Sequence, residues 1–375
     1  MGIVIRQSLL SSAASYIGVI IGFVNAIILM PKFMTPDQIG LFRTLLSAAL
    51  ILSCFGRFGI NSGLVRYKSL LKHPQKELKS LYGIGVLIVF FSSLFFLIIL
   101  IIFRSSWADF YSEKAPDVNK YFVLLIVLTL ELIAFQFLQT LASINKNIFM
   151  ANLLKDLVYK SLNMAGILLF AASIISFHTF IIYHIGFYIL MIGLLFFETI
   201  HKHKIKISFK PLPPKITREL IYYCGTLFIS GLGLSFLNLA DQQLVSRYLG
   251  LEASGIYMTA IFMVMIIEIP RRFVGEISAP IIAQAFGSNN LESINEHYKK
   301  ASINLFLLGG LIYLLIIINL DNIYLIMPKG QIYEAGRNVV ILTGLAKLIN
   351  LLFSINDGII SMSRYYHFNM IITLF

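Results

Sequence analysis

Long apolar runs without charge constrain this chain more than any other feature of its sequence. Residues 86–103, VLIVFFSSLFFLIILIIF, contain no ionisable side chain. A helix of about 20 such residues spans the hydrocarbon core of a bilayer. The whole chain is 58% hydrophobic and 13% charged, whereas soluble domains carry about 25% charged residues. These values exclude a soluble enzyme, a disulfide scaffold and a disordered chain, and they predict an all-α, polytopic membrane protein.

Apolar segments long enough to span a membrane recur along the whole chain when it is scanned with a window of about 19 residues. The first segment is too long for the apolar core of a signal peptide, so we expect it to be the first spanning helix. An eleventh helix begins near His367 and is cut off at Phe375. The predicted complete spans are 8–30, 40–64, 81–103, 121–143, 151–173, 179–199, 219–240, 255–283, 301–320 and 337–360.

Successive loops alternate in their content of Lys and Arg. Loops 65–80 and 200–218 each hold a run of basic residues, whereas the loop at 104–120 holds a few that are matched by acids. Because basic residues collect in cytoplasmic loops, this alternation places the N-terminus in the cytoplasm. It also explains the net charge of +12 without nucleic acid as a partner.

An internal repeat links the two halves of the sequence. Pro31–Thr44, PKFMTPDQIGLFRT, aligns without a gap on Ser246–Thr259, SRYLGLEASGIYMT, at an offset of 215 residues. Both copies follow the first predicted helix of a half and enter its second helix. The repeat is therefore parallel, an arrangement with which transporters build a central site between two lobes. The pairs that agree in type are Lys32/Arg247, Phe33/Tyr248, Met34/Leu249, Asp37/Glu252, Gly40/Gly255, Leu41/Ile256, Phe42/Tyr257 and Thr44/Thr259.

The repeat predicts how the chain divides into domains. We expect an N-terminal six-helix lobe at 1–199, a basic cytoplasmic linker at 200–218 and a C-terminal lobe at 219–375. The two lobes are expected to be pseudo-symmetric bundles around a central cavity. Four full spans and the start of a fifth fall in the second lobe, so this bundle is expected to be incomplete.

Arg57 is the leading candidate for contact with an anionic substrate. It lies 17 residues after Gly40, about 25 Å along the second helix toward the cytoplasm. No acid stands three or four residues away to neutralise it within its own helix. An arginine in a water-filled cavity can hold a phosphate with two hydrogen bonds, and Arg272 is its partner in the repeat. Arg57 could instead extend to the inner headgroups or form an ion pair within one lobe.

Other ionisable residues in the predicted spans are functional candidates because charge inside a membrane is costly. Glu268, Arg272 and Glu276 follow at intervals of four, so they form one stripe that either pairs locally or serves substrate and coupling ion. Glu131 stands alone in the fourth span, as the carrier of a coupling proton or as a neutral packing residue. The further candidate cations for the cavity are Arg43, Arg271 and Lys347.

Two segments near the start of the sequence carry a distinctive pattern of glycine, proline and apolar residues. They are SYIGVIIGFVNAIILMPKFMTPDQIGLFRT at 15–44 and FGRFGINSGLVRY at Phe55–Tyr67. Together with the six-plus-six helix plan and the basic middle loop, they resemble the polysaccharide-biosynthesis flippases, the O-antigen flippase family. These proteins belong to the multidrug/oligosaccharidyl-lipid/polysaccharide exporter (MOP) superfamily. Family members have twelve to fourteen helices, which implies that this sequence is truncated at its C-terminus.

The resemblance implies a transporter that flips a lipid-linked oligosaccharide between membrane leaflets by alternating access. The cargo would be an O-antigen, lipopolysaccharide, capsule or exopolysaccharide unit on undecaprenyl pyrophosphate, and the location would be the bacterial inner membrane. The implied partners are membrane lipids and, in the same pathway, a glycan polymerase and glycosyltransferases. The alternatives are a multidrug or small-molecule exporter of the same superfamily, and a membrane-embedded glycan polymerase or acyltransferase.

The sequence offers no pattern for a catalytic or cofactor site. It lacks the glycine-rich loop that binds nucleotide phosphates in P-loop proteins. His201 and His203 have no further Cys or acid at the spacing of a zinc site. We therefore expect neither enzymatic activity nor a metal or other cofactor.

The predicted orientation can be tested by labelling single cysteines in intact cells. A cysteine in place of Lys204 should resist a membrane-impermeant thiol reagent applied from outside, because the basic loop lies in the cytoplasm. A cysteine in place of Lys114 should react with it. The opposite labelling pattern would overturn the orientation, and labelling both sites after permeabilisation controls for access to the thiol.

Overall fold

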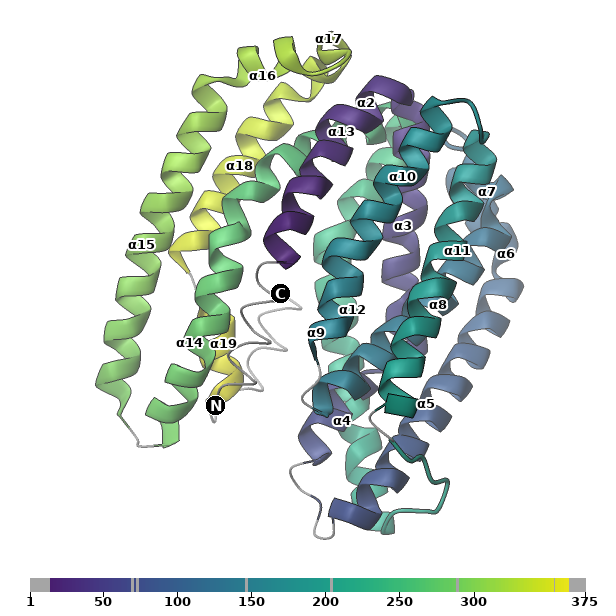
Figure 1. Cartoon of the computed structure of the whole chain (residues 1–375), viewed down its shortest axis with the longest axis vertical. Coiled ribbons are helices and arrows are strands. Elements are labelled where there is room, and N and C mark those ends of the chain that lie inside the picture. The colour runs from purple at the N-terminus through teal and green to yellow at the C-terminus, as the bar shows by residue number, and fades with distance from the viewer. Residues whose placement is uncertain are drawn as a thin grey trace. The chain divides into compact units, whose positions relative to one another are not determined.

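The protein is almost entirely helical in the computed structural model (Figure 1), which describes residues 14–68, 71, 74–145, 148–202, 205–287, 290–353 and 355–363. Within these ranges there is no strand, and nine helices are long and apolar enough to cross a membrane. The prediction of an all-α, multi-pass membrane protein is therefore confirmed. The helix expected near His367 lies outside the described residues.

The long helices are interrupted by short π and 3-10 segments. In the first part of the chain the elements are η1 (Val24–Leu29), α2 (Met30–Phe33), α3 (Pro36–Arg57), α4 (Ile60–Lys68), α5 (Pro74–Ile102), α6 (Arg104–Tyr111), α7 (Asp117–Lys120), α8 (Phe122–Ile144), α9 (Ile148–Asn152), η2 (Leu153–Val158), α10 (Tyr159–Ala171), α11 (Phe177–Phe196) and η3 (Phe197–Lys202). In the second part they are α12 (Pro214–Leu249), α13 (Leu251–Met265), η4 (Ile266–Glu268), α14 (Ile269–Gly287), α15 (Leu291–Ile318), α16 (Leu320–Ile326), α17 (Gly330–Tyr333), η5 (Glu334–Gly336), α18 (Arg337–Leu352) and α19 (Asn356–Met362).

One of the ten predicted spans is missing from the apolar spanning candidates of the described residues. The residues expected at 151–173 are helical through α9, η2 and α10, but the π-helix η2 interrupts them. This stretch carries Lys155, Asp156 and Lys160, and it is not among the apolar spanning candidates of the described chain. π-Segments inside helices occur frequently at functional sites, so η2 is a candidate functional segment.

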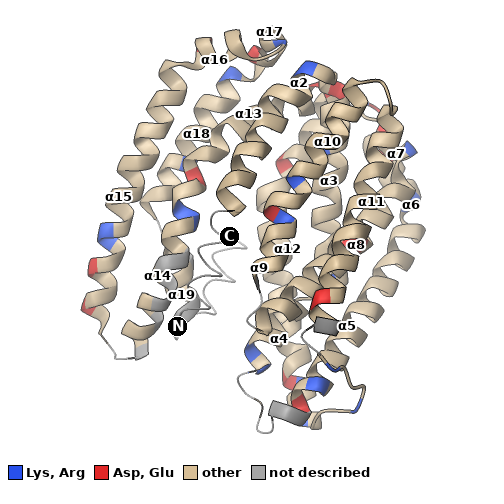
Figure 2. Ribbon diagram, viewed as in Figure 1, with Lys and Arg blue, Asp and Glu red and all other residues tan. Residues whose placement is uncertain are grey.

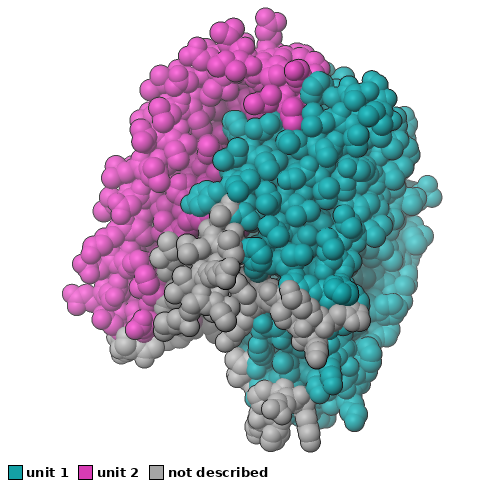
Figure 3. Space-filling view, in the orientation of Figure 1, with its two compact units in different colours: residues 1–25, 33–254 teal, residues 26–32, 255–375 magenta. Residues whose placement is uncertain are grey.

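Cα packing divides the chain into two compact units (Figure 3). The first unit comprises residues 1–25 and 33–254, and the second comprises residues 26–32 and 255–375. The first unit therefore contains α12, which packs along α3 and α4. The lobes expected at 1–199 and 219–375, with their pseudo-symmetry, stay a prediction.

Local sequence signals fix both ends of α3, the helix that carries Arg57. At its start, Thr35 and Gln38 form a reciprocal capping box, and Pro36 occupies the first turn, where its missing N–H costs nothing. At its end, Phe58 and Gly59 have positive φ angles of 44° and 68°, and the Phe58 N–H bonds to a carbonyl of the last turn. These left-handed residues end α3 directly after Arg57 and begin α4.

The junction between α3 and α4 lies directly against α12. A Cβ added to Gly59 would lie 2.4 Å from the Cys224 carbonyl oxygen, and one added to Gly63 would lie 2.6 Å from the Cys224 sulfur. Helices approach this closely only where a residue lacks a side chain. The two glycines therefore allow α12 to contact the end of α3.

The segment between η3 and α12 lies along α5. Residues 205–213 have no regular structure, and the Ser208 N–H donates to the Lys79 carbonyl oxygen at 3.0 Å. A Cβ on Gly83 would lie 2.1 Å from the Ser208 carbonyl oxygen. The middle of the segment predicted as a basic cytoplasmic linker is thus hydrogen-bonded to the first turns of α5.

In the second unit, small residues again permit close packing. A Cβ on Gly309 of α15 would lie 2.1 Å from Leu351 of α18. Ile282, Ala301 and Ile355, from α14, α15 and the residue before α19, form a buried apolar cluster. The core of this unit is therefore built from α14, α15 and α18.

Replacing Gly59 by alanine should destabilise the protein. Alanine is strained in the left-handed backbone conformation of Gly59, and its Cβ would collide with the main chain of α12. We therefore expect the free energy of unfolding to fall by about 2 kcal/mol or more. Gly186→Ala is the matched control, since no heavy atom lies within 4 Å of the added Cβ. The thermal unfolding midpoint in detergent measures both variants, and equal midpoints would contradict the packing described here.

Candidate functional site

Arg57 lies in the last turn of α3 and its side chain is half-buried. Its Nε donates to the Ser53 carbonyl oxygen at 3.2 Å. Its Nη2 lies 3.1 Å from the Cys54 sulfur and 3.5 Å from the Ser53 hydroxyl. All of these partners are neutral and belong to the preceding turn of the same helix.

The positive charge of Arg57 is not balanced by an acid in the part of the chain that the structure describes. Within these residues, no carboxylate lies at ion-pair distance from the guanidinium, and Nη1 makes no hydrogen bond. A guanidinium presents five N–H donors, so one edge is free to hold an anion. The sequence-based interpretation of Arg57 as an unneutralised cation agrees with this geometry.

Arg43 lies near the other end of α3. Its Cζ is 5.7 Å from the centre of the Phe42 ring, and the hydroxyl of Tyr159 lies within electrostatic reach. The side chain is half-buried within the first unit. Its expected role as a cavity cation remains a prediction.

Lys347 of α18 pairs with Glu268 of η4 in the second unit. Lys347 Nζ lies 2.5 Å from Glu268 Oε2, and Asn350 Nδ2 donates to Glu268 Oε1 at 3.3 Å. Glu268 ends the 3-10 turn that interrupts the helix between α13 and α14. The structure thus brings together a candidate cavity cation and a candidate coupling acid that are 79 residues apart in sequence.

Arg271 and Arg272 follow in the first turn of α14. Arg271 is half-buried and Arg272 is exposed, while the Glu276 side chain lies outside the described residues. Arg57 and Arg272 belong to different compact units. Their expected pairing around one substrate therefore stays a prediction. Figure 2 shows that charged residues gather near the ends of the long helices, with few along their middle parts.

Glu131 is buried in the middle of α8. Its side chain is 7% exposed, and neither carboxylate oxygen has a hydrogen-bond partner among the described residues. Tyr188 of α11 lies within electrostatic reach and is hydrogen-bonded to Tyr159 of α10. A buried carboxylate without a described hydrogen-bond partner is compatible with both predicted roles, a packing residue and a proton carrier.

A second buried acid was not identified from the sequence. Ser15 Oγ donates to Asp156 Oδ2 at 2.6 Å, and Asn25 Nδ2 donates to the Lys160 carbonyl oxygen at 2.8 Å. These contacts join the first spanning helix to η2 and α10. The predicted span at 151–173 contains Asp156, but Asp156 was not among the candidate ionisable residues, although its spacing of four residues from Lys160 on one helix face was a signal.

A hydroxyl cluster joins α3 to α12 and was also missed. Thr44 Oγ1 lies 2.6 Å from Ser246 Oγ and 3.3 Å from Ser254 Oγ. Gln243 Nε2 donates to Ser47 Oγ at 2.6 Å and to the Thr44 carbonyl oxygen at 3.2 Å. The five side chains are buried, so their polar groups must satisfy one another.

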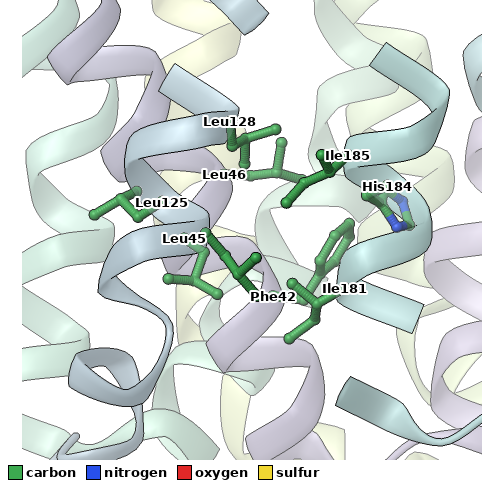
Figure 4. Close-up of a pocket in the computed structure, with 9 residues that line it drawn as sticks. Phe42, Leu45, Leu46, Leu125, Leu128, Ile181, His184 and Ile185 are labelled. Atoms are coloured by element: carbon green, nitrogen blue, oxygen red, sulfur yellow. The ribbon is translucent and has the colours of Figure 1, made fainter. Parts of the chain in front are cut away.

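The pocket drawn in Figure 4 lies among α3, α8 and α11 and is apolar except for His184. The His184 Nδ1 is 3.1 Å from the Phe180 carbonyl oxygen, and its ring lies 4.5 Å from that of Phe42. The pocket offers no charge for a pyrophosphate. Nor do the described residues contain three His, Cys, Asp or Glu side chains grouped closely enough to hold a metal ion.

Comparison with protein families shows the family to which the chain belongs. A family described as polysaccharide biosynthesis protein matches residues 4–286. The chain belongs to this family. A second family, MatE, matches residues 227–375. The resemblance inferred from the first two helices is therefore confirmed. No curated protein sequence matches the chain.

Several solved structures share the fold. An inward-facing multidrug resistance MATE family transporter of the MOP superfamily aligns with a TM-score of 0.70 and 12% identity over 98% of this chain and 87% of that chain. The lipid II flippase MurJ, in an inward closed conformation, aligns with a TM-score of 0.75 and 14% identity over 98% and 78%. A MOP superfamily transporter from Pyrococcus furiosus aligns with a TM-score of 0.56 and 14% identity over 100% and 82%. This polysaccharide biosynthesis family member thus has the fold of MOP superfamily transporters.

A double-mutant cycle should show that Lys347 and Glu268 stabilise each other. Lys347→Met and Glu268→Gln should each destabilise the protein, and the double variant should recover about 1–2 kcal/mol relative to the sum, because the two side chains are partly buried and in contact. Lys300 and Glu296, which are paired but exposed on α15, provide a control cycle with a coupling energy near zero. Additive losses at Lys347 and Glu268 would show that the pair makes no contribution.

Proposed function

We propose that this protein is a flippase that carries a lipid-linked oligosaccharide across the bacterial inner membrane by alternating access. The observation that carries the proposal is the guanidinium of Arg57, which sits at the end of α3 with one edge free and no carboxylate nearby among the described residues. The family membership and the MOP transporter fold support it.

The chemistry of the proposed cargo matches that of Arg57. A pyrophosphate linkage presents several anionic oxygens, and an arginine fork can bind two of them at once. A sugar and a pyrophosphate must leave water during transport, so a cation that is already inside the membrane lowers the cost of their transfer. In this proposal Arg57 contacts the pyrophosphate while the lipid tail stays in the bilayer.

The other candidate cations differ in how much positive charge they would offer to the cargo. Arg43, Arg271 and Arg272 would add positive charge along the path of the cargo. Lys347 contributes less, since Glu268 balances its charge. The arginine pair Arg57 and Arg272 remains the proposed pyrophosphate clamp.

Glu131 is the favoured acid for coupling to a proton in this proposal. It is buried without a hydrogen-bond partner among the described residues, so the uptake or loss of a proton would change the charge inside the first unit. Glu268 and Glu276 are the alternative coupling acids, and Glu268 is already engaged by Lys347. We further propose a cytoplasmic N-terminus and cooperation with the glycan polymerase and glycosyltransferases of the same pathway.

Multidrug or small-molecule export is the second candidate function. The match of residues 227–375 to the MatE family and the similarity to a multidrug resistance transporter favour it. A carrier of cationic drugs needs acids in its cavity. On α3, by contrast, the group without a carboxylate partner among the described residues is the guanidinium of Arg57. The flippase proposal therefore takes precedence.

Substituting Arg57 tests the flippase proposal in the cell that produces this protein. With Arg57→Ala in the chromosomal gene, surface glycan should fall at least tenfold while the amount of protein in the membrane is unchanged, because one charged hydrogen-bonding partner of the pyrophosphate is lost. Arg57→Lys should retain part of the activity, since it keeps the charge but not the fork. Arg104→Ala, at the first residue of α6, controls for general loss of arginine, and normal glycan in Arg57→Ala would refute the role of Arg57.

A further inference from the structure

The Arg57 guanidinium is held in place by groups that carry no charge. Nε and Nη2 donate to the Ser53 carbonyl oxygen, the Ser53 hydroxyl and the Cys54 sulfur. Nη1 has no partner among the described residues. The side chain is therefore fixed along one edge and open along the other.

The Cys54 thiol has its own fixed surroundings. It is 7% exposed, and its sulfur lies 3.0 Å from Ser235 Oγ on α12 and 3.7 Å from the Leu50 carbonyl oxygen. Because a guanidinium only donates hydrogen bonds, the sulfur accepts from Arg57. The thiol hydrogen is then free to point to Leu50 or Ser235. Cys54 thus connects Arg57 to a residue of the neighbouring helix.

The nature of these acceptors decides what the cation can do. A carboxylate would orient the guanidinium but would also cancel its charge, as Glu268 does for Lys347 in the second unit. A thiol and a carbonyl orient it and leave the full charge available to an incoming anion. Rigid placement also lowers the entropy that is lost when a ligand binds.

Aromatic contacts restrain the same part of α3 from the side of α12. The Phe228 ring lies 5.6 Å from that of Phe55 and 5.1 Å from that of Phe58. These residues flank Arg57 in sequence, and Ser235 lies two turns further along α12. The backbone of α3 is thereby packed against α12 on both sides of Arg57.

We propose that Ser53 and Cys54 are positioning residues, which aim the free edge of the Arg57 guanidinium at the anionic group of the cargo, and that Ser235 of α12 fixes the Cys54 thiol for this purpose. The proposal rests on the proposed function, in which Arg57 contacts a lipid pyrophosphate. The ligand chemistry it requires is a pyrophosphate or similar polyanionic headgroup.

The test measures binding of farnesyl pyrophosphate to the purified full chain in detergent, with farnesol as the uncharged comparison. Cys54→Val replaces the acceptor with two methyl groups and should weaken binding of farnesyl pyrophosphate about tenfold, the loss expected for one hydrogen bond to a charged group. Cys54→Ser keeps an acceptor and should stay within about twofold of the natural protein. Farnesol binding should be equal in all three.

Two further variants separate positioning from packing. Ser235→Ala leaves α3 intact and should weaken binding about threefold, which keeps the test informative if Cys54→Val does not fold. In an Arg57→Lys background the fork is absent, so Cys54→Val and Cys54→Ser should bind farnesyl pyrophosphate equally. Thermal unfolding midpoints confirm that each variant is folded.

The outcomes distinguish the two proposals. If Arg57→Ala binds farnesyl pyrophosphate as tightly as the natural protein, the proposed function of Arg57 fails, and the positioning role fails with it. If Arg57→Ala weakens binding while Cys54→Val and Ser235→Ala do not, only the positioning role is overturned. Equal weakening by Cys54→Val and Cys54→Ser would also overturn it, since the hydrogen-bond acceptor would then be irrelevant.

Discussion

The high cost of an unbalanced charge in an apolar environment governs this molecule. The chain meets that cost in two ways. In the second unit, Lys347 is paired with Glu268, which removes the net charge but leaves little attraction for a ligand. In the first unit, Arg57 is surrounded by a carbonyl, a hydroxyl and a thiol, which solvate the cation without neutralising it. The first arrangement balances the charge within the protein, and the second leaves the charge of Arg57 available, as the proposed function requires.

The helical architecture followed from the sequence because a bilayer leaves few alternatives. Backbone groups in hydrocarbon must bond within their own segment, so apolar runs such as 86–103 predict helices directly. The end of α3 at Arg57 was missed, since one span was expected at 40–64, although Gly59, Asn61 and Gly63 are a local signal for a break. The interruption of the predicted span at 151–173 by η2 was not foreseen, because an apolar pattern does not distinguish an α-helix from a π-helix.

The side-chain partners could not be predicted from one sequence. Lys347 and Glu268 are 79 residues apart, and Ser15 and Asp156 are 141 apart, so only the folded packing shows that they meet. Arg57 could be identified from the sequence because no acid stands three or four residues away from it in its own helix. The cluster around Thr44 was invisible for a different reason, since serine, threonine and glutamine are frequent and carry no charge that attracts notice in an apolar sequence.

The contact between Thr44, Ser246 and Ser254 has a consequence for how α3 and α12 can separate. Hydroxyl groups serve equally as donors and acceptors, so each can exchange its present partner for water without a change of protonation. Separation at this point would therefore be nearly independent of pH and salt, whereas an ion pair in the same place would be sensitive to both.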